Sequence, residues 1–168
     1  YLVEVVSGMP FDEFLRTRIF DPLGMDDTRF YFPEKKAGRL VTVQHKVNGS
    51  WEKYPVTFYD TDYPVKGART FYSGGAGLSS TAMDYAIFLQ MYLNQGAYNG
   101  IRLLSRTTVN LILSNQIGNI WGADAASQFG LAFEILSENG QARGGMGSAG
   151  TFNWGGYFNS QYFADPQE

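Results

Sequence analysis

Residues 74–85 read GGAGLSSTAMDY, a glycine-rich turn that runs directly into a helix start. Thr81 and Asp84 have the spacing of a capping box, in which a hydroxyl and a carboxylate satisfy the first N–H groups of a helix. Gly96 then marks the end of the helix. Apolar residues follow the i, i+3, i+4, i+7, i+8 rule and predict a core-facing amphipathic helix: Tyr85, Phe88, Leu89, Tyr92 and Leu93.

Working toward the N-terminus, the chain alternates short helices with a hairpin. Residues 1–8 read as the end of a helix with Gly8 as a left-handed cap, and Pro10 suits the first turn of the next helix, which Pro22-Leu23-Gly24 ends. From 39 to 58 the pattern indicates β structure, with a tight hairpin turn at Asn48-Gly49. Residues 59–71 are turn-rich and aromatic, which predicts a surface loop.

Working toward the C-terminus, helix gives way to sheet. Asn99-Gly100 predicts a second tight turn, and Ser105 can cap a further helix. Phe129, Leu131, Phe133 and Ile135 alternate with smaller or polar residues and predict one half-buried strand. Residues 151–164 are aromatic and predict paired strands.

Composition narrows the function classes. The chain has 168 residues, 44% hydrophobic and 17% charged, so we expect a single domain or a large piece of one. A net charge of −3 without basic runs argues against nucleic acid, and no segment reaches the roughly 20 apolar residues of a membrane span. The absence of cysteine and a lone histidine, His45, argue against a metal site and most Ser-His-Asp arrangements. No cofactor is expected, and compartment and oligomeric state stay open.

Four ordered patterns resemble the β-lactamase-related serine hydrolases, which include class C β-lactamases, D-alanyl carboxypeptidases and family VIII esterases. The resemblance is weakest over residues 29–72 and 117–128. It rests on EVVSGMP (4–10), IFDPLGMDDT (19–28), GGAGLSSTAMDY (74–85), and WGG (154–156) followed by DP (165–166).

The resemblance implies an α/β (α+β) fold of the β-lactamase/transpeptidase type, an antiparallel sheet with packed helices. Residues 1–168 would be a single partial domain, the C-terminal portion, truncated at both ends. The family uses a Ser-x-x-Lys nucleophile and a Tyr-x-Asn base, both expected upstream of Tyr1, with a Lys-Thr-Gly-type triplet on a strand.

Trp154, Gly155 and Gly156 stand in the place of that triplet, so the resemblance implies that they bind substrate. It also makes the backbone N–H of Tyr157 an oxyanion-hole donor. Glycine in the triplet would let a substrate carbonyl approach the backbone closely. Trp154 replaces a cation, which favours neutral esters over β-lactams or peptides.

Local matches to the missing motifs have structural explanations. Ser50-Trp51-Glu52-Lys53 matches Ser-x-x-Lys but follows a hairpin turn, where side chains at i and i+3 point to opposite faces. Tyr92-Leu93-Asn94 lies in the amphipathic helix, and Tyr157-Phe158-Asn159 belongs to the triplet strand. His45 is more plausibly a surface or hydrogen-bonding residue than a general base.

The expected function of the parent protein is hydrolysis of a small ester or amide through an acyl-serine intermediate, while residues 1–168 alone should hydrolyse nothing. Two other readings stay open. The protein could be a catalytically inactive relative whose aromatic residues bind a cell-wall peptide or glycan. It could also be an assembly module whose sheet edges pair with another chain.

Overall fold

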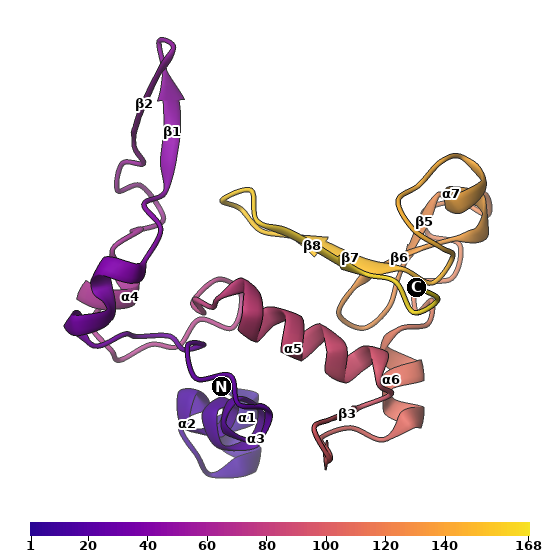
Figure 1. Ribbon diagram of the computed structural model, residues 1–168, viewed down its shortest axis with the longest axis horizontal. Helices are drawn as coiled ribbons and strands as arrows, with labels where there is room; N and C mark the ends of the chain where they lie inside the picture. Colours follow the sequence, from indigo (N-terminus) through magenta and orange to yellow (C-terminus); the bar gives the residue numbers. More distant parts are fainter. The chain divides into compact units, whose positions relative to one another are not determined.

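The computed structural model describes all residues from 1 to 168 and has two compact units, residues 1–85 and 86–168 (Figure 1). None of the helices combines the length and apolar character needed to cross a bilayer.

The first unit opens with helices that begin and end where the sequence predicts. Helix α1 (Leu2–Ser7) ends at Gly8, whose φ of 69° is the left-handed cap. Helix α2 (Phe11–Leu15) follows Pro10 and continues through a π-helical turn, η1 (Arg16–Phe20), into α3 (Asp21–Leu23). Gly24, at φ 73°, ends this run in the same left-handed conformation.

The predicted hairpin is confirmed but shorter than expected. Strands β1 (Gln44–Val47) and β2 (Ser50–Lys53) pair around Asn48 and Gly49, and both turn residues have positive φ, as a tight hairpin turn requires. The expected strand start at 39 is wrong, because a 3₁₀ helix, η2 (Glu34–Arg39), ends there. The predicted loop over 59–71 contains one helical turn, α4 (Tyr63–Lys66).

The predicted capping box is confirmed for the Thr81 hydroxyl, whereas the Asp84 carboxylate binds other groups. Helix α5 (Ala82–Leu93) begins as expected, with the Asp84 N–H donating to the Thr81 hydroxyl over 3.1 Å. The buried Asp84 carboxylate instead accepts from the Asp27 N–H over 2.9 Å and from the Thr28 hydroxyl over 2.8 Å. Asp84 therefore fixes residues 27–28 to the start of α5.

The core of the first unit is small and aromatic. The Phe30 ring is 2% exposed and contacts the rings of Phe11 and Tyr72, with centroids 5.6 and 5.3 Å apart. The other buried apolar side chains come from the end of the helical run and the segment after it: Phe20, Leu23, Met25 and Phe32.

The second unit is built on a four-stranded antiparallel sheet in the order β5-β6-β7-β8. Its strands are β5 (Ser127–Phe129), β6 (Glu134–Leu136), β7 (Phe152–Gly155) and β8 (Gln161–Ala164). Before them come the tight hairpin of β3 (Ala97–Tyr98) and β4 (Ile101–Arg102), and α6 (Arg106–Ile112), capped by the Ser105 hydroxyl as predicted. Helix α7 (Glu138–Ala142) lies in the connection from β6 to β7.

The prediction of one strand through Phe129, Leu131, Phe133 and Ile135 is wrong. The stretch is a hairpin: β5 ends at Phe129, residues 130–133 turn, and β6 begins at Glu134. Leu131 lies in the turn and is exposed. Gly130 permits the turn to pack closely, since a Cβ there would lie 2.0 Å from the Ile112 carbonyl oxygen.

The core of the second unit lies between α5 and the sheet. The Tyr92 ring contacts the Phe133 ring edge-on at 5.2 Å and lies 6.1 Å from the Phe152 ring, which is fully buried. The predicted core position of Tyr92 is thus confirmed. Met91, Val109 and Ile135 complete the core.

Candidate functional site

The candidate site is the part of β7 that β6 leaves unpaired. β6 pairs with only Phe152 and Asn153 of β7, whereas β8 pairs with β7 as far as Gly155. From Trp154 onward, the β6 side of β7 is therefore an open strand edge. An open edge presents backbone N–H and C=O groups to any ligand that lies along it.

Hydrogen bonds on both sides of β7 show which backbone groups face this edge. The Gly156 N–H donates to the Ser160 carbonyl over 2.7 Å, toward β8, while the Thr151 carbonyl accepts from the Leu136 N–H over 2.8 Å, on the β6 side. Backbone groups of successive residues alternate between the two sides of a strand. By this alternation we expect the N–H group of Gly155 to face the open edge. Contrary to the sequence prediction, Tyr157 does not continue the strand, because a bond from the Asn159 N–H to the Gly156 carbonyl places it in the β7–β8 turn.

The two glycines of the site differ in what the fold asks of them. A Cβ on Gly156 would lie 2.3 Å from the Ser160 hydroxyl oxygen, so the Ser160 side chain would have to rotate, and the other contacts of the Cβ would be at 3.7 Å or more. A Cβ on Gly155 would make only ordinary contacts, at 3.7 Å or more. The local fold therefore does not require glycine at 155, and close approach of a ligand would explain it.

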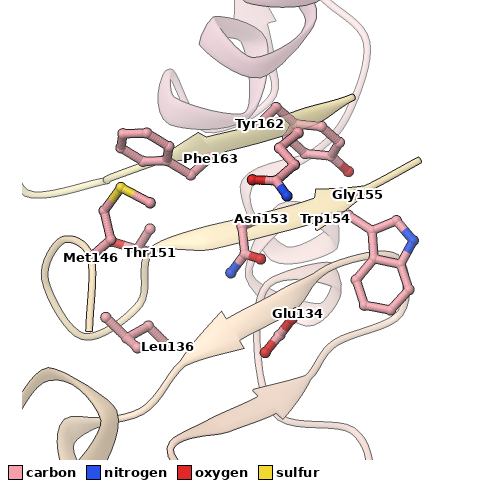
Figure 2. Close-up of a pocket in the computed structure, with 10 residues that line it drawn as sticks. Glu134, Leu136, Met146, Thr151, Asn153, Trp154, Gly155, Tyr162 and Phe163 are labelled. Carbon is pink, nitrogen blue, oxygen red and sulfur yellow. The ribbon is translucent and has the colours of Figure 1, made fainter. Parts of the chain in front are cut away.

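Trp154 lines a hollow on the sheet face, and the predicted cleft position of its ring is compatible with its 46% exposure. Figure 2 shows the Trp154 ring at one end of this hollow, with Met146 and Phe163 at the other and Asn153 between them. Gly155 also lines the hollow, whereas Tyr157 lies beyond β7 in the exposed turn.

The electrostatics of the sheet are simple. Glu134 is the only residue of the four strands with a formal charge, and it lines the same hollow as Trp154. Its strand partners are Asn153 on one side and Phe129 on the other. The sheet therefore offers no cation to a substrate carboxylate and places an anion beside the site.

Ser50-Trp51-Glu52-Lys53 and His45, which we attributed to structure, lie on the hairpin strands of the first unit. Ser50 and Lys53 are exposed on β2, and the Lys53 ammonium pairs with Asp62 over 2.9 Å. His45 lies on β1 with its ring 5.4 Å from that of Tyr54. No cluster of three or more His, Cys, Asp or Glu side chains could hold a metal ion.

Sequence reasoning missed three residues near the site. Phe129 contacts the Trp154 ring edge-on at 5.0 Å, and Trp121 contacts Phe129 at 5.9 Å. Glu134 was missed with them. The alternation of 129–135 was the only available signal, and it could not show that Phe129 ends a strand beside Trp154.

The β-lactamase family model matches residues 1–168, so the chain belongs to the β-lactamase family. Protein Rv1367c of Mycobacterium tuberculosis is 28% identical over 175 residues, which cover 98% of this chain and 43% of that protein. A putative D-alanyl-D-alanine carboxypeptidase of Escherichia coli O157:H7 is 27% identical over 181 residues, 99% of this chain and 39% of that protein.

Among solved structures, EstCE1, described as a hydrolase with promiscuous acyltransferase activity, matches with a TM-score of 0.80. It is 25% identical, and the match covers 99% of this chain and 45% of that chain. The chain thus spans less than half the length of these relatives. The predicted fold, a mixed α/β structure of the β-lactamase and penicillin-binding-protein type, is confirmed. The relatives support a function of the serine hydrolase type.

Proposed function

We propose that the intact protein containing this chain is a serine hydrolase that acts through an acyl-serine intermediate, and that this chain supplies its substrate-binding strand. The open edge of β7 carries the proposal. It is a strand edge with a glycine, Gly155, that the surrounding fold does not need. Family membership supports the same chemistry.

In the proposed reaction, a serine outside residues 1–168 attacks the carbonyl carbon of the substrate. The Tyr157 N–H donates to the carbonyl oxygen as negative charge develops on it, which lowers the barrier. The alcohol leaves with a proton, and the acyl group stays on the serine oxygen. Water then attacks the same carbon and releases the acid, regenerating the serine hydroxyl.

The proposed substrates are uncharged esters. Trp154 stands where a cation would hold a substrate carboxylate, and Glu134 adds a negative charge to the same hollow. Both features disfavour β-lactams and peptides that end in a carboxylate. We therefore expect a higher kcat/KM for p-nitrophenyl acetate than for nitrocefin, and faster turnover of nitrocefin would contradict the ester assignment.

Gly155→Val tests the role of the edge. Valine suits a strand and its Cβ would make only ordinary contacts, but its side chain would block close approach of a substrate carbonyl. We expect ester kcat/KM to fall by about 100-fold, the scale of losing an oxyanion contact. Gly75→Ala, at a glycine with ordinary φ and open space, is the matched control and should keep its activity.

If a folded Gly155→Val variant keeps wild-type activity, the open edge of β7 does not take part in the reaction. If the intact wild-type protein hydrolyses neither ester nor β-lactam, the better interpretation is a catalytically inactive relative that binds a ligand.

A further inference from the structure

Three aromatic rings form a continuous row that leads away from the open edge of β7. The Trp154 and Phe129 ring centroids are 5.0 Å apart with an interplanar angle of 82°, and those of Phe129 and Trp121 are 5.9 Å apart at 74°. Both tryptophans keep about half of their surface exposed, 46% and 50%. We call Trp121, Phe129 and Trp154 the aromatic wall.

The segment that carries Trp121 is held in place by its own hydrogen bonds. The Gln116 N–H donates to the Phe129 carbonyl over 2.8 Å, which fixes the segment to the end of β5. The Asn115 side chain bonds at 3.0 Å both to the Ile117 N–H and to the Gly118 carbonyl. These bonds restrain the segment that leads to Trp121, which reduces the entropy lost on binding.

The charges around the wall disfavour an anionic ligand. Residues 107–137 carry only two charged side chains, Asp124 and Glu134, and both are acidic. Both carboxylates would repel an anionic ligand, and Glu134 is the strand partner of Phe129 in the wall. Large flat rings instead give rigid apolar contact area at little cost in side-chain entropy.

We infer that the aromatic wall binds the alkyl or aryl group of an uncharged ester whose carbonyl lies at the open edge of β7. The wall begins at Trp154, the residue next to Gly155, so a group attached to a carbonyl at that edge would extend along Phe129 to Trp121. For the reaction itself, this inference rests on the proposed function. Trp121 and Phe129 then become residues that determine chain-length specificity.

A binding measurement tests the wall independently of catalysis. The probe is 6-bromohexanamide, an uncharged amide whose bromine quenches indole fluorescence on contact. In the intact protein we expect saturable quenching that weakens by about tenfold in affinity in Trp121→Ala, the scale of losing an apolar contact in a binding pocket. Trp121→Phe should keep most of the affinity. Ile120→Ala, its exposed neighbour, is the matched control and should bind like wild type.

A kinetic measurement on the same variants completes the test. We expect the ratio of kcat/KM for p-nitrophenyl hexanoate to that for the acetate to fall by about tenfold in Trp121→Ala and to stay unchanged in Ile120→Ala. Saturable quenching without any ester hydrolysis would refute the proposed function but support the proposal that the aromatic wall binds an apolar group.

The wall is refuted if esters are hydrolysed while Trp121→Ala changes neither the ratio nor the quenching. It is equally refuted if the probe does not quench at all, as when another segment of the intact protein covers these rings.

Discussion

Within each of the two units, a different kind of contact stabilises the fold. In the first unit, polar groups join distant segments: Asp84 binds residues 27–28, and the Tyr63 hydroxyl donates to the Phe71 carbonyl and is hydrogen-bonded to the Tyr31 hydroxyl. In the second unit, rings from α5, β7 and the β5–β6 turn pack on one another.

Electrostatics in the first unit reinforce this contrast. Hydrogen bonds from Arg39 and Lys36 hold the pKa of the Asp27 carboxyl well below its usual range. Partial burial, together with the hydrogen bond to Tyr31, raises the pKa of Tyr63 to about 12. The first unit thus adds directional bonds between specific atoms to its small aromatic core. The second relies on apolar packing against one face of its sheet, which leaves backbone groups at the β7 edge available for a substrate.

The largest expected effect on stability comes from the apolar core of the second unit. Phe152 is fully buried between Tyr92 and Phe133, so Phe152→Ala should lower the free energy of unfolding by about 3–5 kcal/mol. Urea denaturation of the intact protein measures it. Leu131→Ala, in the exposed β5–β6 turn, is the control, and equal losses in the two variants would contradict this account of the core.

A smaller effect is expected from the polar network of the first unit. Asp84→Ala removes the acceptor of the Asp27 N–H and leaves the Thr28 hydroxyl only its bond to the Ser80 hydroxyl, so it should lower the free energy of unfolding by about 1–3 kcal/mol. The same denaturation experiment applies. Asp26→Ala removes an exposed carboxylate from the same segment and should change little. If the Asp84→Ala variant has the same free energy of unfolding as the wild type, this network does not stabilise the unit.

The smallest effect depends on pH and involves Asp165, the polar group that ties the end of β8 to residue 148. N–H groups of Gln167 and Ser148 donate to its carboxylate and lower its pKa. A carboxyl with a lowered pKa stabilises the fold above its unfolded pKa of about 3.9, and this contribution is lost as the pH falls through the folded pKa.

Asp165→Asn should therefore melt below wild type at pH 7, with the difference shrinking as the pH falls below about 4. Thermal melts across this range measure the effect, with the exposed Asp124→Asn as control. A difference that grows on acidification would contradict the assignment.

Short-range signals predicted much of this fold. Asn48-Gly49, Asn99-Gly100 and the Ser105 cap act within a few residues, and the structure has all three. The alternation of apolar residues from 129 to 135 wrongly predicted a single strand, because the turn at 130–133 lacks an Asn-Gly signal and keeps the same alternation. Asp84 was assigned to a cap because its other partners lie 56 and 57 residues away in sequence.

The site was predictable only in part. The resemblance named Trp154 to Tyr157, but the open edge depends on where β6 stops pairing with β7, which no local pattern encodes. The aromatic wall likewise depends on Phe129 ending β5 next to Trp154.

The most direct test of the central claim is the intact mass of the full protein after incubation with a fluorophosphonate, with the labelled peptide mapped by fragmentation. We expect one adduct, on the serine of a Ser-x-x-Lys motif outside residues 1–168. An adduct on Ser50, or no labelled serine at all, would contradict the proposal that β7 serves an acyl-serine hydrolase.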